Sequence, residues 1–469
     1  MFGGVSMSFL GACAVPHPPL IIPEIGRGEE KGISATIEAY EITAKWIVDK
    51  DPDLVIITSP HATMYADYMQ ISSGTTARGS FANFGHPELA FEVEYDEEFV
   101  RQVEQTAGEI QLATGTLGRQ NNDLDHGTMI PLYFLQRAGY TGKVVRIGLS
   151  GLSYVHHYAL GVLLRETADK LNRRMMIVAS GDLSHKLKED GPYGFAEEGP
   201  VFDKRMAECF RTGDFLQLLM TPAKLAEGAA ECGLRSFWIM AGAFDCLEVE
   251  PKLLSCEGPF GVGYGVAQFT PVGKNEERNI GEQAVECHKK AMAERRSKED
   301  AYLRLARHSL ESYVRDGKRL AVPPDLAAEL LNTRAGAFVS IKKAGQLRGC
   351  IGTILPVRDS LAAEIIANAV AAGTEDPRFP AVTVDELDDL VYDVDVLSEP
   401  EPIDSPKQLD VKRYGVVVSS ADGHRRGLLL PDLDGIDTVE EQISIARRKG
   451  GISPDEKVKL QRFEVTRHE

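Results

Sequence analysis

The sequence predicts an α/β protein with an N-terminal, mainly parallel sheet flanked by helices, followed by a smaller α+β domain. Apolar runs alternate with amphipathic stretches up to about residue 270, and a charged segment poor in branched apolar residues interrupts them at 273–298. Beyond it, helices and strands follow one another without strict alternation. At 469 residues the chain also exceeds one ordinary domain. We therefore expect domains at 1–272 and 299–469, joined by a charged linker at 273–298.

The first domain begins with the apolar run "FLGACAVP", which predicts a buried strand. The segment that follows has Ile37, Tyr40 and Ala44 at helical spacing and predicts a helix, with Ser34 as its expected N-terminal cap. The runs "LVIITSPH", "GKVVRIGLS" and "RRMMIVASGDLSH" predict further strands, with a helix near 156–172 before the last. Continuous apolar strands separated by helices are typical of a parallel sheet covered on both faces. "EGPFGVGYGVAQFTPV" closes the domain as a glycine-rich strand.

The second domain is predicted to start with an amphipathic helix, in which Leu303, Ala306 and Leu310 share one face. "AGAFVSIKKAGQLRGCIGTIL" predicts a hairpin, and a helix is expected near 359–373. "LVYDVDVLSEPEPI" and "YGVVVSSADGHRRGLLLP" supply further strands. We expect Cys350 to be a buried hairpin residue. The alternative is a nucleophile, for which His424 is a poor candidate partner.

Charge and cysteine content restrict the partners and the compartment. Lys and Arg number 52 against 70 Asp and Glu, a net charge of −18, which argues against a nucleic-acid or membrane partner. No apolar run approaches the roughly 18 residues of a membrane span, and no signal peptide is recognisable. The seven cysteines form no CxxC pair, a pattern that favours a reduced, cytoplasmic protein. A homodimer is the default expectation for oligomeric state.

Three histidines occupy the same place in the strand pattern. His17, His61 and His185 each lie just beyond the end of a predicted strand, and a fourth, His126, lies just before a helical segment. In an open parallel sheet, ligands bind outside the carboxyl ends of the strands. Imidazole is the commonest metal ligand, and a proline directly before His17 and before His61 stiffens each approach. The pattern predicts a metal site at this edge of the sheet.

Two adjacent residues are candidates for a third ligand. Glu231 and Cys232 begin an apolar, helix-like stretch in "EGAAECGLRSFWIMAGAF". With two histidines, a carboxylate completes a 2-His-1-carboxylate face that suits non-haem Fe(II). A thiolate from Cys232 would instead favour copper or zinc. The residues alone leave both open.

Several stretches of the first domain resemble one known family. They are "VPHPPL", "TSPHAT", "LDHGTMIPLYFL", "SGDLSHKL", "AECGLRSFWIMAGA" and "EGPFGVGYGVA". Over about residues 8–270 this ordered set resembles the class III extradiol ring-cleavage dioxygenases of the LigB-like superfamily, to which the Memo proteins also belong. The resemblance implies an oxidoreductase that inserts both atoms of O₂ into an aromatic diol at Fe(II).

The resemblance also implies roles for single residues. His17 and His61 match the family's two iron-binding histidines, and Glu231 matches its carboxylate ligand. His185 matches the active-site acid/base histidine, which is expected to accept a proton from the diol at neutral pH. His126 matches a second histidine that lines the substrate pocket.

Rival functions follow from the same residues. Memo-like members have a cysteine at the position of Cys232 and lack the carboxylate, so the presence of Glu231 favours the iron-enzyme branch. The rivals are an O₂-independent metalloenzyme and a Memo-like metal-binding or scaffold protein. Asp125 and Asp182 are expected either to orient the neighbouring histidine rings or to cap turns.

The second domain resembles the AMMECR1 family through "QLRGCIGTILP", "DPRFPAVTVDEL" and "GLLLPDLDGIDTVEEQISIARRKGGI". The resemblance covers nearly all of 299–469 and implies a fold more than a chemistry. Fusion of the two domains implies that they act in one process.

Overall fold

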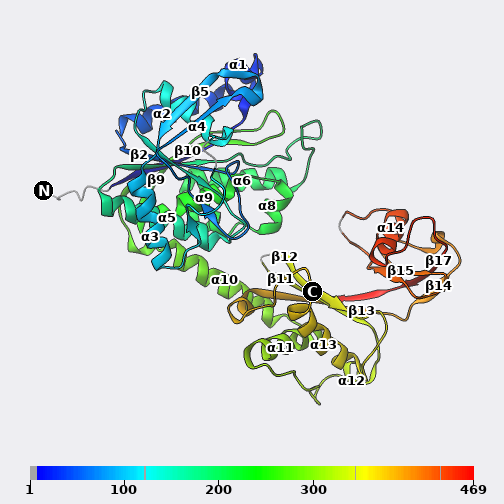
Figure 1. The fold of residues 1–469 in the computed structure, drawn as a ribbon. Helices are drawn as coiled ribbons and strands as arrows, with labels where there is room; N and C mark the ends of the chain where they lie inside the picture. The colour runs from blue at the N-terminus through cyan, green and yellow to red at the C-terminus, as the bar shows by residue number, and fades with distance from the viewer. Residues whose placement is uncertain (1–7, 121–122, 344, 434) are drawn as a thin grey trace. The chain divides into compact units, whose positions relative to one another are not determined.

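The computed structural model describes residues 8–120, 123–343, 345–433 and 435–469 (Figure 1). The chain divides into two compact units, Met1–Cys287 and His288–Glu469. The division falls inside the charged segment 273–298, within helix α10 (Ile280–Ser297). None of the helices in the described residues is long and apolar enough to cross a membrane.

The first unit contains the long central strands and most of the helices. Its strands are β1 (Phe9–Val15), β2 (Leu54–Ser59), β3 (Met69–Gln70), β4 (Thr76–Phe81), β5 (His86–Glu94), β6 (Thr114–Gly115), β7 (Lys143–Gly148), β8 (Met175–Ser180), β9 (Leu247–Glu257) and β10 (Tyr264–Lys274). Its α-helices before α10 are α1 (Pro23–Gly26), α2 (Ser34–Asp49), α3 (Glu97–Glu109), α4 (His126–Arg137), α5 (Tyr154–Leu171), α6 (Glu198–Thr212), α7 (Phe215–Leu219), α8 (Ala223–Ala229) and α9 (Leu234–Ala243).

The central sheet has the strand order β7-β2-β8-β1-β10-β9. Strands β7, β2, β8 and β1 run parallel, whereas β10 is antiparallel to both β1 and β9. This confirms the predicted mainly parallel sheet. The antiparallel strand β10 is the predicted glycine-rich strand, and β9 lies beyond it at the edge of the sheet.

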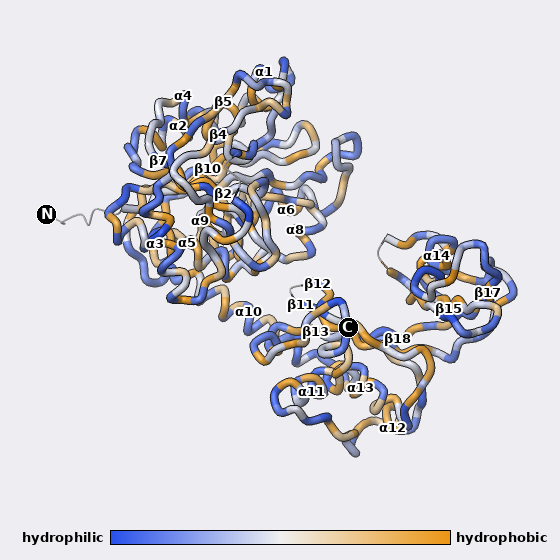
Figure 2. Tube along the Cα trace, in the orientation of Figure 1, coloured by the Kyte–Doolittle hydropathy of each residue, from blue (hydrophilic) through white to orange (hydrophobic). Residues whose placement is uncertain are grey.

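Helices cover both faces of this sheet, as Figure 1 shows with α2 and α4 on one side and α3, α5 and α9 on the other. Successive residues of a strand pack alternately into the hydrophobic clusters on the two faces of the sheet. On β2, Leu54 and Ile56 belong to one hydrophobic cluster, and Val55 and Ile57 belong to the other. Burial on both faces explains why the strands are continuously apolar. Figure 2 shows hydrophobic and hydrophilic stretches alternating along the chain in both units.

The prediction that Ser34 caps α2 is wrong. Ser34 is already the first residue of the helix, Ile33 occupies the cap position, and no side chain caps it. The chain enters α2 directly from a 3₁₀ turn, Glu29–Ile33. The first-turn amide of Thr36 donates instead to Glu257 on the distant strand β9, at 2.8 Å, so a tertiary contact replaces the local cap.

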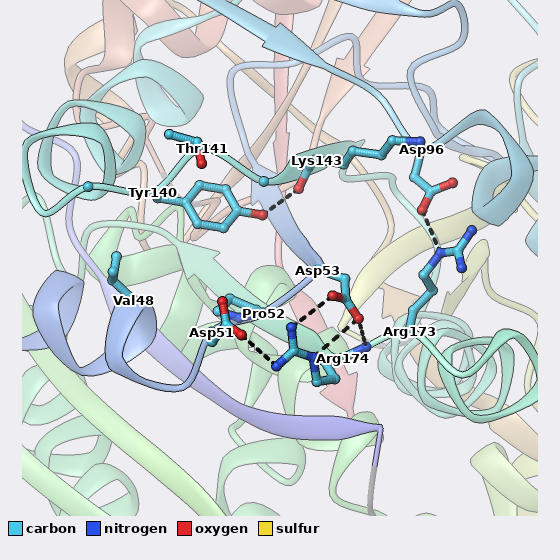
Figure 3. Close-up of a pocket in the computed structure, with 12 residues that line it drawn as sticks. Val48, Asp51, Pro52, Asp53, Asp96, Tyr140, Thr141, Lys143, Arg173 and Arg174 are labelled. Atoms are coloured by element: carbon cyan, nitrogen blue, oxygen red, sulfur yellow. Dashed lines mark hydrogen bonds and ion pairs between the residues drawn. The ribbon is translucent and has the colours of Figure 1, made fainter.

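The amino-terminal edge of the sheet is held by ion pairs (Figure 3). Arg174 contacts Asp51 at 2.7 Å and Asp53 at 3.0 Å, which joins the entrances of β8 and β2. Arg173 contacts buried Asp96 at 3.0 Å. These groups line a cavity of about 590 Å³. Because its arginines are already paired with carboxylates, we assign this edge a structural role.

The second unit contains two four-stranded antiparallel sheets, ordered β12-β11-β13-β18 and β14-β17-β15-β16. Its strands are β11 (Ala337–Lys343), β12 (Gln346–Gly352), β13 (Leu390–Leu397), β14 (Glu401–Ile403), β15 (Gly415–Ser420), β16 (Arg426–Leu429), β17 (Val458–Phe463) and β18 (Val465–His468). Its helices after α10 are α11 (Ala301–Asp316), α12 (Ala328–Asn332), α13 (Leu361–Thr374) and α14 (Val439–Lys449). The predicted α+β class is confirmed.

The "LRGCIG" segment forms β12 of the predicted hairpin. Cys350 is partly buried, and the Ser340 hydroxyl donates a hydrogen bond to its Sγ at 3.2 Å. Burial raises the pKa of the Cys350 thiol. Arg348 binds both carboxylate oxygens of Glu386, at 3.0 and 2.9 Å. His424 lies in the turn between β15 and β16, in the other sheet, so the structure gives Cys350 the hairpin role.

His157 on α5 makes the stability of the first unit sensitive to acid. Its Nδ1 lies 3.0 Å from the carbonyl of Ser153, and its Nε2 lies 3.4 Å from the amide of Ser150, a pairing that requires the neutral ring. Burial is the largest cause that lowers the pKa of His157, to about 4. The unfolded chain therefore binds this proton first, and stability falls as the pH drops from about 6.5 toward 4.

Between pH 7 and pH 5 the parent should lose about 2 kcal/mol of unfolding free energy through His157. The His157→Gln variant should not show this loss. Urea unfolding followed by tryptophan fluorescence reports on this unit, because both tryptophans, Trp46 and Trp238, lie in it. His86→Gln, at a partly exposed ring in the β4–β5 hairpin, is the matched control and should keep the parental pH dependence. An unchanged pH dependence in His157→Gln would contradict the assignment.

Candidate metal centre

Two of the strand-end histidines meet above the sheet. His17 lies two residues after β1 and His61 two residues after β2. Their Nε2 atoms are 3.0 Å apart and their ring centroids 4.8 Å apart. Two nitrogens at about 2.1 Å from one ion and about 90° apart would be separated by about 3 Å. The pair therefore fits two neighbouring positions around one metal ion.

The protein fixes which nitrogen of His17 faces the centre. The Ser180 hydroxyl donates to the carbonyl of Gly127 at 2.6 Å, and its oxygen lies 3.0 Å from His17 Nδ1. Because that hydroxyl proton is already used, Nδ1 must be the donor, which leaves the lone pair on Nε2. The backbone amide of His17 donates to Asp182 at 2.8 Å, which holds the loop in place.

His126 joins the same cluster from helix α4. The sequence predicted His126 just before a helix, and it is the first residue of that helix, with its ring centroid 3.9 Å from that of His61. His17, His61 and His126 each contribute one ring nitrogen to a group whose three atoms lie within 4.8 Å of one another. Burial and the neighbouring imidazoles lower the pKa of His17 to about 3 and that of His126 to about 4. Both are therefore neutral at pH 7, the form that binds metal.

A second group of ligand atoms shares His17. It comprises His17, Asp182 and Cys232, again within 4.8 Å of one another. Cys232 Sγ lies 3.7 Å from His17 Nε2, and the amide of Asp182 donates to that sulfur at 3.3 Å. Burial raises the pKa of the Cys232 thiol well above its usual value. Asp182 was not among the predicted ligands, although it follows β8 as the histidines follow their strands and the same strand-end pattern could have identified it.

Glu231 points elsewhere in this conformation. Its carboxylate accepts a hydrogen bond from the amide of Leu234 at 2.6 Å, at the start of helix α9. Burial raises its pKa. Neither ligand group found among the described residues includes Glu231. The structure thus places Cys232, rather than Glu231, beside His17.

His185 lies near Asp182 and is held by a backbone carbonyl. Its Nδ1 donates to the carbonyl of Ala230, a residue held at φ 52° by the turn that ends α8. The lone pair is therefore on Nε2, which lies 3.9 Å from a carboxylate oxygen of Asp182. The exposed ring of Tyr193 packs against the imidazole edge-on, with centroids 5.1 Å apart. These contacts orient His185 without any need for metal ligation.

Of the two roles considered for Asp125, the structure supports capping. Its Oδ1 accepts from the amide of Thr128 at 3.0 Å, and its Oδ2 accepts from the hydroxyl of Thr128 at 3.0 Å. The Ser59 hydroxyl at the end of β2 donates to it at 2.5 Å. Buried Arg146 lies 3.7 Å away. Asp125 therefore ties the strand that carries His61 to the helix that begins with His126.

Asp125→Ala should lower the unfolding free energy of the first unit by about 1–2 kcal/mol, because the start of α4 loses its cap. Asp125→Asn keeps an accepting oxygen and should lose clearly less. Urea unfolding of both variants measures the difference. Equal losses in the alanine and asparagine variants would remove capping as the role of Asp125.

The first unit is an α/β domain with a mainly parallel sheet and a cluster of histidines at the carboxyl edge of that sheet. Residues 11–267 match the family described as the catalytic LigB subunit of aromatic ring-opening dioxygenase. Residues 303–468 match the AMMECR1 family. The chain belongs to the LigB family and carries an AMMECR1 domain behind its LigB domain.

Relatives share this architecture or one half of it. Protein CA_C1420 of Clostridium acetobutylicum is 39% identical over 470 residues, covering 98% of this chain and 99% of its own. A protein of Thermotoga maritima is 52% identical over 172 residues, 36% of this chain and 98% of its own. The solved structure of the uncharacterized protein PH0010 from Pyrococcus horikoshii is 34% identical and covers 35% of this chain and 88% of its own, with a TM-score of 0.33.

Proposed function

We propose that the LigB domain is a non-haem Fe(II) dioxygenase that cleaves the ring of a catecholic substrate beside its hydroxyl groups. The observation that carries the proposal is the 3.0 Å approach of two neutral imidazoles, His17 and His61, at the ligand-binding edge of a parallel sheet. Family membership supports an oxygenase of this general kind. The AMMECR1 domain is proposed to act in the same process.

His17 and His61 would hold the iron, with Glu231 as the third ligand if its carboxylate leaves the amide of Leu234. Bound Fe(II) supplies a template for the diol and O₂ and the electron transfer between them. The other steps belong to the protein. Ser180 contacts the ring of buried His17 and Asp182 binds its backbone amide, and both contacts orient the imidazole toward the cluster.

His185 would take a proton from a substrate hydroxyl at Nε2. Its Nδ1–H is bound to the carbonyl of Ala230, so Nε2 alone is available as the base. The nearby carboxylate of Asp182, 3.9 Å away, would stabilise the resulting imidazolium. Half-buried His126 stays neutral and would donate a hydrogen bond to a substrate oxygen.

A second candidate is a Memo-like metal-binding protein in which Cys232 is a ligand. The observation that favours it is the 3.7 Å distance from Cys232 Sγ to His17 Nε2. A thiolate ligand would shift the preference from iron toward copper or zinc. Metal coordination would also remove the thiol proton, despite the raised pKa of the free side chain.

Elemental analysis of anaerobically purified variants separates the two candidates. For the dioxygenase, His17→Gln, His61→Gln and Glu231→Gln should each weaken iron binding by at least about tenfold, whereas Cys232→Ser should retain iron. For the Memo-like protein, Cys232→Ser should lose the metal, Glu231→Gln should keep it, and the metal should be copper or zinc. Parent protein that binds no metal would refute both.

A catechol panel tests the chemistry. Fe(II)-loaded protein exposed to oxygen should convert at least one catechol to a ring-opened chromophore. His185→Ala should lower that rate by at least about a hundredfold while its iron content stays at the parental value. Iron loss in His185→Ala would make this residue a ligand, and an inert iron-loaded parent would refute ring cleavage.

A further inference from the structure

We infer that Asp203, on helix α6, is a positioning residue that holds His185 in the orientation proposed for the base. The Asp203 carboxylate accepts a hydrogen bond from the backbone amide of Ser184 at 2.8 Å. Ser184 is fully buried and directly precedes His185 in the chain. The orientation is a property of the structure, and its catalytic consequence rests on the proposed function.

Ser184 has each of its polar groups bound. Its carbonyl accepts from the amide of Gly263 at 2.7 Å, and its hydroxyl donates to the carbonyl of Ala229 at 3.0 Å. The same hydroxyl oxygen accepts from the amide of Lys186 at 2.9 Å. Asp203 supplies the acceptor for the remaining group, the Ser184 amide, which would otherwise be a buried donor without a partner.

The imidazole of His185 depends on the same short segment. Its backbone amide donates to the carbonyl of Ala229 at 3.0 Å, and its Nδ1 donates to the carbonyl of Ala230. Both carbonyls lie at the end of α8, so the segment is held by α8 on one side and by α6 on the other. A shift of Ser184 would move the ring away from Ala230. The Nδ1–H that leaves the lone pair on Nε2 would then lose its acceptor.

Two close contacts fix α6 against this segment. A Cβ on Gly263 would lie 1.9 Å from a carboxylate oxygen of Asp203, so the carboxylate lies directly against the Gly263 backbone. A Cβ on Gly199 would lie 2.3 Å from the carbonyl oxygen of Lys186. Gly199 and Asp203 are four residues apart and share one face of α6. Glycine at both positions lets the helix approach closely enough for the carboxylate to reach Ser184.

Asp203 holds this amide through its oxygen and not through its charge. Burial raises the pKa of the Asp203 carboxyl to about 7, and the hydrogen bond from the Ser184 amide opposes that rise. Near neutral pH the carboxyl is therefore present in both forms, and each form keeps an oxygen that can accept from the amide. Asparagine offers the same accepting oxygen, so Asp203→Asn should preserve the contact and Asp203→Ala should abolish it.

The tautomer of His185 tests the inference without metal or turnover. In metal-free, full-length protein labelled with ¹⁵N-histidine, NMR distinguishes a neutral ring protonated at Nδ1 from one protonated at Nε2, at about pH 8. The His185→Gln variant identifies the signal. The parent and Asp203→Asn should show the Nδ1–H ring. Asp203→Ala should shift the signal toward the Nε2–H ring, because the displaced Nδ1 no longer meets the carbonyl of Ala230.

Asp214→Ala is the matched control. The Asp214 carboxylate accepts from the amide of Gln217 at 2.8 Å at the start of α7, so this variant loses a bond of the same kind and length beyond the far end of α6. It should keep the parental tautomer. Gly263→Ala displaces the Asp203 carboxylate without removing it, and it decides the matter if Asp203→Ala does not fold. An Nδ1–H ring in Asp203→Ala and in Gly263→Ala, or a changed tautomer in Asp214→Ala, would overturn the inference.

Turnover gives a separate readout once ring cleavage is established. Asp203→Ala should lower kcat by at least about tenfold, because a displaced base misses the substrate proton, while its KM and iron content stay near the parental values. Asp203→Asn should stay within about threefold of the parental kcat, since it keeps the accepting oxygen. An unchanged kcat in Asp203→Ala would contradict the inference. Failure of the catechol assay leaves the tautomer measurement unaffected, so the two proposals can fail separately.

Discussion

The parallel strands β1, β8 and β2 end at the same height in the sheet, and the candidate metal centre depends on this alignment. Strand β8 lies between β1 and β2, and its Ala179 pairs with Ala14 on one side and Thr58 on the other. His17 and His61 therefore leave the sheet at the same height. Neighbouring strands are about 4.8 Å apart, so two imidazoles reaching across one strand span the roughly 10 Å between β1 and β2. Ser180, at the end of that middle strand, is left to contact His17 from below.

A contact between two glycines brings Asp182 and Cys232 close to His17. A Cβ on Gly181 would lie 2.1 Å from the Cα of Gly233, so the loop after β8 and the turn before α9 touch backbone to backbone. The amide of Gly233 donates to the carbonyl of Asp182 at 3.1 Å. This contact places Cys232 and Asp182 together beside His17. Larger side chains at either glycine would push the thiol away from the imidazoles.

The sequence was informative wherever a side chain's position follows from periodicity. The strand-end pattern predicted where His17 and His61 lie, and the apolar segment after His126 predicted the start of a helix there. The choice between Glu231 and Cys232 lay outside that reasoning. The left-handed conformation of Ala230 turns the chain just before them, and a rotation of one residue decides which side chain faces His17. Backbone conformation of this kind leaves no mark on hydrophobic spacing.

Neighbouring residues at the entrance to α9 have different surroundings. Glu231 turns back to the amide of Leu234, Cys232 lies beside His17, and the charge of Arg235 reaches His157 on α5. Glu231 and Cys232 precede the helix, so the left-handed turn at Ala230, and not a helical repeat, sets the direction of each side chain. An amphipathic pattern reports only the face that meets the core.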